Sequence, residues 1–159
     1  YCVPFTELQE ALRDNCPEEL FTVLMRRLMV KIANRICAAN DYGAIITGES
    51  VAQVASQTLP AIFCTNAAAE YPVFRPVIGM DKREIVDVAR HIDTFEVSTL
   101  PYEDCCTVFS PKHPKTRPSL EEILAAEASF DFEPLIEKAV RETEVKQFKY
   151  GVRNVDLDM

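Results

Sequence analysis

One segment constrains the fold of this chain more than any other: the apolar run AIIT at residues 44–47, followed by the turn GES at residues 48–50. A short apolar run of this kind is typical of a strand buried in a parallel sheet. The preceding residues 18–39 carry apolar side chains at three- and four-residue steps, which predicts an amphipathic helix. We interpret residues 51–59 as another helix, which follows the turn. A strand, a tight glycine turn and a helix in this order form the repeating unit of an α/β fold.

Other segments extend the predicted sheet. Residues 72–78 indicate a second strand and residues 96–99 a short third strand, while residues 1–5 resemble the end of a strand that enters a turn. Strands that alternate with helices favour a parallel sheet with helices on both faces. In such sheets the ligand binds beyond the carboxyl ends of the strands.

Capping signals indicate where further helices begin. Asp81 with Glu84 three residues later matches a capping box, and so does Ser119 with Glu122. Additional helices are expected at residues 6–14 and near residues 134–141. In the helix that follows Asp81, four apolar residues recur at helical spacing and should form its buried face: Ile85, Val88, Ala89 and Ile92.

The composition supports a single folded domain. The chain has 159 residues, of which 48% are hydrophobic, enough to form a core. Its 25 acidic and 17 basic residues give a net charge of -8, which argues against a strong grip on RNA or DNA by this chain alone. No apolar run approaches the roughly 20 residues of a membrane helix, and no secretion signal is visible. Of the six cysteines, Cys37 and Cys64 lie in apolar contexts that predict buried thiols, and we expect a reducing, cytoplasmic compartment.

The turn at residues 48–50 is the first candidate site. A backbone that turns at Gly48 can aim N–H groups at a phosphate or at an adenine edge. The same residues also fit a plain tight turn, with Ser50 as the N-cap of a helix. Gln53 and Gln57 are four residues apart and would share one helix face, where they either contact a base or ribose or face solvent.

A basic ridge is the second candidate and comprises Arg26, Arg27, Lys31 and Arg35. Arginine binds phosphate through a planar fork of donors. A solvent-facing stripe that balances the acidic chain is the commoner origin of such a pattern.

The adjacent cysteines Cys105 and Cys106 are the third candidate, in a proline-rich loop. The pKa of a thiol falls near cationic groups, and Lys112 and Lys115 follow in the same loop. Three interpretations remain open: a sulfur-carrying nucleophile, a pair of metal ligands, and plain loop thiols. Metal-binding cysteines are usually spaced CxxC, so we assign no metal ligand. Neither a Walker A sequence nor an SGGxDS pyrophosphate loop is present.

Four stretches, in this order, closely resemble the tRNA 4-thiouridine sulfurtransferase family: LMRRLMVKIANRIC, TGESVAQVASQTL, YPVFRPVIGMDKREIVDVARHIDT and PYEDCCTVFSPKHPKTRP. This family is also known as the thiamine-biosynthesis protein ThiI family, and the resemblance runs from about Val3 to about Phe132. It implies an adenine-nucleotide alpha-hydrolase-like fold of the pyrophosphatase-loop (PP-loop) type. Residues 1–150 would be the C-terminal portion of the PP-loop ATPase/sulfurtransferase domain, and residues 151–159 a tail. The strand and SGGxDS-type loop that open this domain, and the RNA-binding domains of the family, are then expected upstream.

The resemblance also implies a reaction. ATP, with Mg²⁺, adenylates the oxygen at C4 of a uridine in tRNA, and a persulfide sulfur delivered from a cysteine desulfurase then displaces AMP. The implied partners are this desulfurase and tRNA, the latter bound mainly through domains absent here, and the resemblance leaves a homodimer open. Sulfur transfer for thiamine thiazole synthesis is a second activity that the family name suggests.

Residue by residue, the family's nucleotide-contacting positions match Arg26, Gly48 and Gln57. Three further candidates lie beside them: Glu49, Ser50 and Gln53. The family's catalytic cysteine matches either Cys105 or Cys106. The chain departs from the family at Ala52, near the nucleotide, and at Asp93, at a helix C-terminus; the family commonly has glycine at both positions. Aspartate can adopt a left-handed conformation at such a terminus, at some cost.

Two alternatives to a tRNA sulfurtransferase remain at this point. One is a related PP-loop ligase that adenylates a small molecule, and THUMP-like sequence upstream would separate the two. The other is a non-catalytic remnant of the domain that binds a nucleotide or a protein partner.

Overall fold

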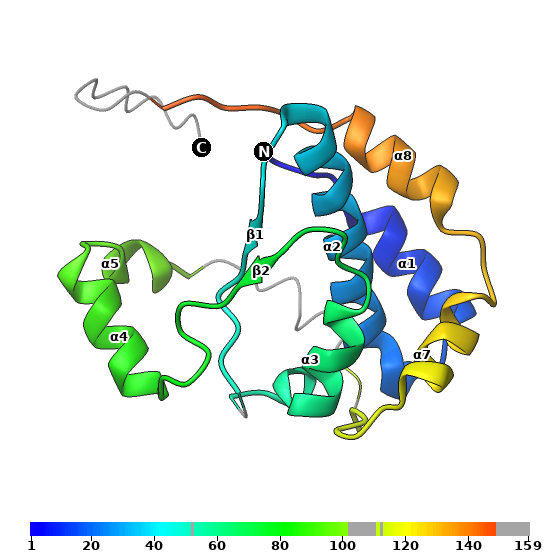
Figure 1. Cartoon of the computed structure of the whole chain (residues 1–159), viewed down its shortest axis with the longest axis horizontal. Coiled ribbons are helices and arrows are strands. Elements are labelled where there is room, and N and C mark those ends of the chain that lie inside the picture. The colour runs from blue at the N-terminus through cyan, green and yellow to red at the C-terminus, as the bar shows by residue number, and fades with distance from the viewer. Residues whose placement is uncertain (52, 102–110, 112, 149–159) are drawn as a thin grey trace.

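The chain forms a helical body next to a short parallel sheet (Figure 1). The computed structural model describes residues 1–51, 53–101, 111 and 113–148. In chain order, the described elements are the helix α1 (Thr6–Asn15), the 3-10 helix η1 (Glu18–Leu20), α2 (Phe21–Asn40), the strand β1 (Ile45–Ile46), η2 (Ala55–Gln57), α3 (Leu59–Asn66), β2 (Val73–Phe74), α4 (Lys82–His91), α5 (Phe95–Ser98), α7 (Leu120–Glu127) and α8 (Glu133–Arg141).

Helix α2 is the centre of the helical body. Its predicted apolar stripe is confirmed, because Phe21, Met25, Leu28 and Ile32 are all buried. Helices α1, α3, α7 and α8 share one hydrophobic core with this stripe. The helix ends where Asp41 adopts a left-handed conformation with a φ of 55°. Within the described residues, no helix is both long enough and apolar enough to cross a membrane.

The two described strands, β1 and β2, run parallel, as the sequence predicts. Ile45 pairs with Val73 and Ile46 with Phe74. Ile45 and Val73 pack towards α2, where Cys37 belongs to the same small core. Because side chains alternate along a strand, Ile46 and Phe74 point to the other face, where both are exposed. In Figure 1, α4 and α5 lie on the far side of the strands from α2, so the predicted parallel sheet flanked by helices on both sides is confirmed.

The helix predicted at residues 51–59 is wrong. The described residues of this segment form turns, bends and η2, and α3 begins only at Leu59. The Thr58 hydroxyl accepts a hydrogen bond from Ala61 N and thereby caps α3. Pro60 occupies the first turn of α3, where a missing N–H leaves no intrahelical bond unmade. The sequence Thr-Leu-Pro therefore starts α3 and does not continue an earlier helix.

Helix α4 begins at the predicted capping box. The Asp81 carboxylate accepts from Glu84 N at 2.9 Å, and the Glu84 carboxylate accepts from Asp81 N at 2.7 Å. The buried face predicted for this helix is wrong, because no residue of α4 is buried, and Val88 and Ile92 are exposed. Among the described elements, α4 packs mainly on the short helix α5, which cannot cover an entire helix face.

The chain reverses after α4 and forms a helix where a third strand was predicted. Asp93 adopts the left-handed conformation expected at this position, with a φ of 57°. Residues 96–99 do not form a strand, and α5 includes most of them. Ser98 N donates to Thr94 O at 3.0 Å, and the Arg90 guanidinium lies 4.7 Å from the centre of the Phe95 ring. No described strand lies alongside as a partner, so the backbone groups of this segment pair within one turn.

The last helices anchor the chain to its beginning. Ser119 caps α7 by accepting a hydrogen bond from Glu122 N at 3.2 Å, but the Glu122 side chain pairs with Lys115. The structure therefore contains the serine half of the predicted capping box. Helix α8 coincides with the helix predicted near residues 134–141. Beyond it, Cys2 and Glu144 form an antiparallel bridge that holds the N-terminal segment.

Candidate functional site

Four polar side chains meet where β1 and β2 end. Thr47 and Glu49 follow β1, Arg75 follows β2, and Arg26 reaches in from α2. Glu49 is only 2% exposed, and both of its carboxylate oxygens accept hydrogen bonds. Oε1 accepts from Arg26, while Oε2 accepts from Arg75 Nε at 2.7 Å and from Thr47 Oγ1 at 2.9 Å. We call these four residues the Glu49 cluster; it lies at the sheet edge where parallel sheets bind their ligands.

The Glu49 cluster carries an excess of positive charge. Burial alone would raise the pKa of Glu49, but the hydrogen bond from Arg75 and the charge of Arg26 outweigh this effect and hold the pKa below its usual value. Glu49 is therefore ionised at neutral pH. Since arginine stays protonated in proteins, two guanidinium groups face one carboxylate. An anionic ligand would balance the remaining positive charge.

The two arginines differ in how many of their nitrogens bond within the chain. Each guanidinium nitrogen of Arg75 bonds within the chain: Nε to Glu49, Nη2 to Asn66 Oδ1 at 3.1 Å, and Nη1 to the Val73 carbonyl at 3.5 Å. Arg26 bonds to Glu49 through Nη2, but its buried Nε has no hydrogen-bond partner among the described residues. Arg75 is therefore held at all three of its nitrogens, whereas Arg26 is held at Nη2 alone among the described residues.

A pocket of about 270 Å³ adjoins the Glu49 cluster. Arg26, Glu49 and Arg75 line its polar side, and Val30 and Ile45 contribute apolar wall. Apolar walls with a few convergent polar groups are the usual form of a small-molecule site. The pocket therefore combines an apolar surface with a cationic end.

The turn after β1 is held by its own side chains. Ser50 is buried and donates its hydroxyl to the Met80 carbonyl at 2.6 Å, so its interpretation as a helix N-cap is wrong. The Gln57 side-chain oxygen accepts from Ser50 N at 3.0 Å, which leaves the Gln57 amide N–H₂ for another acceptor. Gln53 is exposed, and because no helix connects it to Gln57, the predicted shared helix face is also wrong. Contacts of either glutamine with a nucleotide stay predictions.

Gly48 is not required by the conformation of the chain itself. Its φ lies outside the left-handed region, and a Cβ built on it would meet no described atom within 4 Å. Backbone strain therefore does not account for glycine at this position. A ligand that approaches the backbone closely would account for it. The neighbouring departure from the family pattern, Ala52, lies outside the described residues.

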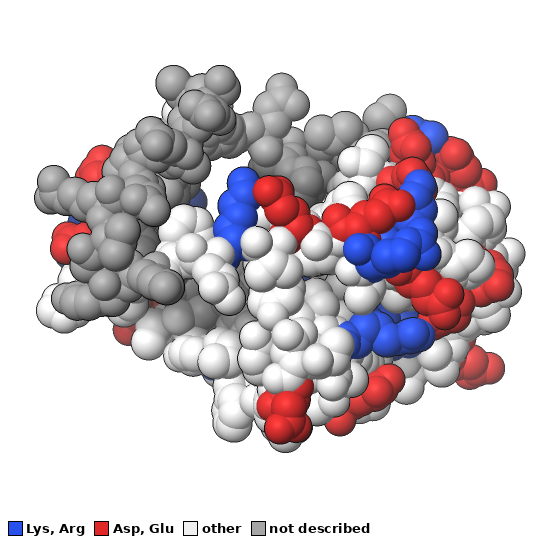
Figure 2. Space-filling model, turned by 90° about the horizontal axis from the view of Figure 1, so that it is seen from above, with Lys and Arg blue, Asp and Glu red and all other residues white. Residues whose placement is uncertain are grey.

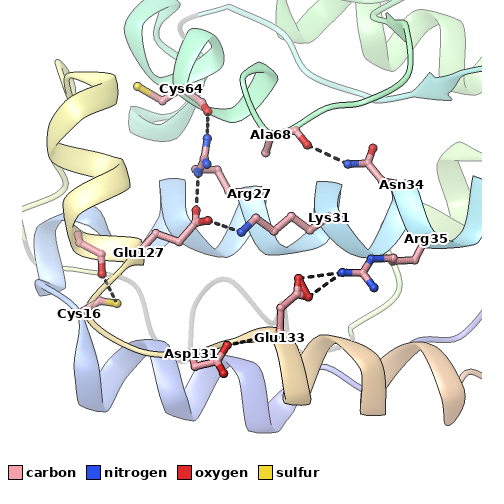
Figure 3. Close-up of polar contacts among 11 residues, drawn as sticks. Cys16, Arg27, Lys31, Asn34, Arg35, Cys64, Ala68, Glu127, Asp131 and Glu133 are labelled. Atoms are coloured by element: carbon pink, nitrogen blue, oxygen red, sulfur yellow. Dashed lines mark hydrogen bonds and ion pairs between the residues drawn. The ribbon is translucent and has the colours of Figure 1, made fainter.

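Most of the basic ridge of α2 is paired with carboxylates (Figure 3). Arg27 is buried, so the solvent-facing interpretation is wrong for it, and its Nε donates to Glu127 Oε2 at 2.6 Å. Lys31 donates to the other oxygen of Glu127, and Arg35 makes two bonds to Glu133 at 2.7 and 2.8 Å. Burial would raise the pKa of Glu127, but the hydrogen bonds from Arg27 and Lys31 outweigh it and lower that pKa. These contacts fasten α2 to α7 and α8, and they leave Arg26 as the ridge residue in the pocket.

Acidic and basic side chains are intermixed on the face seen in Figure 2. Lysine and arginine side chains lie beside aspartate and glutamate there and do not gather into one broad basic patch. The described residues of this face therefore form no extended basic surface, in agreement with the net charge of -8.

Cys105 and Cys106 lie outside the described residues, so their roles stay predictions. Hydrogen bonds attach the segment that follows them to the helical body. Lys115 N donates to the Glu19 carbonyl at 3.0 Å, and Thr58 Oγ1 donates to the Thr116 carbonyl at 2.7 Å. Thr58 therefore caps α3 and holds this segment with the same hydroxyl.

Of the four described cysteines, Cys2 is exposed and Cys16 is partly buried. Cys37 and Cys64 are buried, as predicted. Burial raises the pKa of Cys64, and it also raises the pKa of Cys16. A raised pKa disfavours the reactive thiolate at neutral pH.

The sequence analysis did not identify Arg75 as a site residue, although its position in the sequence indicated that it could be one. Arg75 lies within the predicted second strand, next to Pro76, and residues at the carboxyl ends of parallel strands gather at one edge of a sheet. Its bond to Glu49 spans 26 residues of sequence, so no local spacing rule connects the two.

Known proteins identify the family of this chain. The family model described as thiamine biosynthesis protein (ThiI) matches residues 1–132. The chain belongs to the ThiI family. Two relatives of this ThiI-family chain are both described as a probable tRNA sulfurtransferase. The protein from Acetivibrio thermocellus is 54% identical over 145 residues, which cover 91% of this chain and 37% of the relative. The protein from Caldanaerobacter subterraneus subsp. tengcongensis is 53% identical over 137 residues, which cover 86% and 36%.

A solved structure shares the fold of this ThiI-family chain. It is the crystal structure of a 4-thiouridine synthetase–RNA complex with bound ATP, with a TM-score of 0.84 and 36% identity over 91% of this chain and 38% of that chain. The predicted PP-loop type of α/β fold is thereby confirmed. The chain spans little more than a third of the length of the relatives that it matches. The predicted domain boundary at residue 150 lies outside the described residues and stays a prediction.

Proposed function

We propose that this chain is part of the catalytic domain of an ATP-dependent tRNA uracil 4-sulfurtransferase, which makes 4-thiouridine in tRNA. The observation that carries the proposal is the match to the ThiI family over residues 1–132. The fold shared with a 4-thiouridine synthetase that was crystallised with RNA and ATP supports it. ATP activates the uridine oxygen at C4 as a leaving group, and a persulfide sulfur from a cysteine desulfurase replaces that oxygen. Because this chain is acidic, tRNA is held mainly by other parts of the whole protein.

The Glu49 cluster and its turn are the proposed contacts to ATP. Arg26 lines a pocket with an excess of positive charge and bonds within the described residues only through Nη2, which suits a phosphate group. Gly48 allows a ligand to approach the backbone closely. Gln57 holds the turn through its oxygen and offers its N–H₂ group to the ligand, while Glu49 orients Arg26. The apolar wall of the pocket suits a flat base.

We assign no residue of this chain to Mg²⁺. The described residues contain no group of three or more His, Cys, Asp or Glu side chains that could hold a metal ion. Mg²⁺ would arrive with ATP, bound largely by the phosphates themselves.

The sulfur step is assigned to the loop of adjacent cysteines. One of Cys105 and Cys106 acts as the nucleophile or as the resolving thiol towards the incoming persulfide. Lys115 and Thr116, which come after the two cysteines in the sequence, bond to the helical body. The partner of Thr116 is Thr58, the residue next to Gln57. The residues proposed for adenylation and those proposed for sulfur transfer are thus attached to the same helical body.

Complementation tests the proposal. The whole natural reading frame, and its variants Cys105→Ser, Cys106→Ser and Arg26→Ala, are expressed in a strain that lacks 4-thiouridine. The nucleoside is then quantified in digested tRNA by mass spectrometry. We expect the parent to restore 4-thiouridine, one cysteine variant to abolish it, and Arg26→Ala to reduce it strongly. Cys16→Ser serves as the matched control, because Cys16 packs against α7 away from the pocket and should leave the product unchanged.

Two outcomes would contradict the proposal. A folded parent that restores no 4-thiouridine when a persulfide donor is present would favour a non-catalytic remnant. A parent that binds ATP but adenylates a small molecule would favour the ligase alternative. A thiamine-requiring strain, complemented in the same way, tests whether the protein also supplies sulfur for the thiazole of thiamine.

A further inference from the structure

Arg75 occupies a position that the proposed nucleotide contacts leave unexplained. It follows β2, lines the pocket and bonds to the same carboxylate as Arg26. Yet its guanidinium nitrogens already bond to Glu49, Asn66 and Val73. An arginine held by the chain at all three of its nitrogens is fixed in position, which suits it to hold another group in place.

Glu49 needs this second arginine. A carboxylate that is 2% exposed loses nearly all contact with water, and that loss is costly unless partners replace it. Thr47 and Arg75 occupy Oε2, which directs Oε1 towards Arg26. Without Arg75, burial would push the pKa of Glu49 upward, and a protonated Glu49 would hold Arg26 less firmly.

We propose that Arg75 is a positioning residue for nucleotide binding: it fixes Glu49, and Glu49 fixes the Arg26 guanidinium at the pocket. Asn66, at the end of α3, accepts a hydrogen bond from Arg75 Nη2 through its side-chain oxygen and so helps to fix Arg75. This inference rests on the proposed function, because it takes Arg26 as the residue that contacts ATP. It adds Arg75 as a residue that affects the ligand indirectly, by way of Glu49 and Arg26.

A double-mutant cycle tests the inference in the purified whole protein. The dissociation constant for ATP with Mg²⁺ is measured by calorimetry for the parent, Arg26→Ala, Arg75→Ala and the double variant. We expect each single variant to bind about tenfold more weakly or worse, since each loses a charge-assisted contact or its support. If Arg75 acts only through Arg26, the double variant should match Arg26→Ala within about twofold.

Steady-state kinetics separate positioning from a general structural role. Arg75→Ala should raise the KM for ATP and leave the KM for tRNA unchanged, whereas loss of folded protein would lower kcat and change neither KM. Arg75→Lys keeps the positive charge near Glu49 but lacks the planar fork, so its dissociation constant for ATP should lie between those of the parent and Arg75→Ala. It also replaces Arg75→Ala if that variant does not fold. Arg13→Ala, on the exposed pair with Asp14, is the matched control and should bind ATP like the parent.

The outcomes distinguish this inference from the proposed function. Weak ATP binding by Arg26→Ala together with normal binding by both Arg75 variants overturns the role of Arg75 alone. Losses that multiply in the double variant overturn the claim that Arg75 acts through Arg26. Normal ATP binding by Arg26→Ala overturns the proposed nucleotide site, and the role of Arg75 with it.

Discussion

Replacing Glu127 with glutamine should destabilise the fold far more than the same change at Glu133. Both carboxylates pair with basic residues of α2 (Figure 3). Arg27 and Glu127 are 3% and 11% exposed, whereas Arg35 and Glu133 are 45% and 48% exposed. Glu127→Gln would leave the charge of Arg27 buried with uncharged partners, the Cys64 carbonyl at 2.6 Å and the oxygen of the new glutamine.

The expected magnitudes differ because the burial differs. Removing one partner of a buried ion pair costs about 3–5 kcal/mol, since the other charge stays uncompensated. Glutamine retains one acceptor oxygen, so we expect Glu127→Gln to lower the free energy of unfolding by about 3 kcal/mol. An exposed pair contributes less than about 1 kcal/mol, which bounds the loss for Glu133→Gln. Urea unfolding at pH 7, followed by circular dichroism, measures both losses.

Equal losses in the two variants would refute this reasoning, because the substitutions are chemically identical and the larger loss is attributed to the burial of the Arg27–Glu127 pair. Added salt offers a second check. It should shrink the small loss at Glu133, whose pair is screened by solvent, and should barely change the loss at Glu127.

Asp93→Gly should raise the melting temperature, because glycine adopts a φ of 57° without the steric cost that aspartate bears, up to roughly 1 kcal/mol; an unchanged or lower value would argue against that cost. Thr58→Val should lower the free energy of unfolding by about 1–2 kcal/mol, since Ala61 N–H loses its cap and the Thr116 carbonyl its donor. Thr58→Ser keeps the hydroxyl and should stay close to the parent, so equal losses in both variants would exclude the hydroxyl as the cause. Acid should remove the difference in the free energy of unfolding between the parent and Glu127→Gln, because the pKa of Glu127 is lower in the folded chain than in the unfolded chain. Its stabilisation is then complete above about pH 5 and declines below about pH 4, and a difference that grows in acid would contradict this sign.

Local patterns predicted those elements whose stability is itself local. The stripe of α2 and the capping box of Asp81 depend on residues three or four positions apart, and the structure contains both. The start of α3 was also encoded locally, by Thr58 and Pro60, and was misinterpreted because a helix was expected directly after the turn. The exposed face of α4 could not be foreseen in this way, since the pattern indicates which side is apolar but not what covers it.

The same distinction between local and long-range information applies to the candidate site. The sequence by itself, through its motifs, identified the family and predicted that Arg26 and Gly48 contact a nucleotide. Only the tertiary structure decided that Glu49 is a buried acceptor between two arginines, because those bonds span 23 and 26 residues. The same structure paired Arg27 with a carboxylate 100 residues away and so separated it from its neighbour Arg26. An ion pair forms between side chains that are close in space. The spacing of two residues in the sequence determines that distance only when both lie in the same helix or strand.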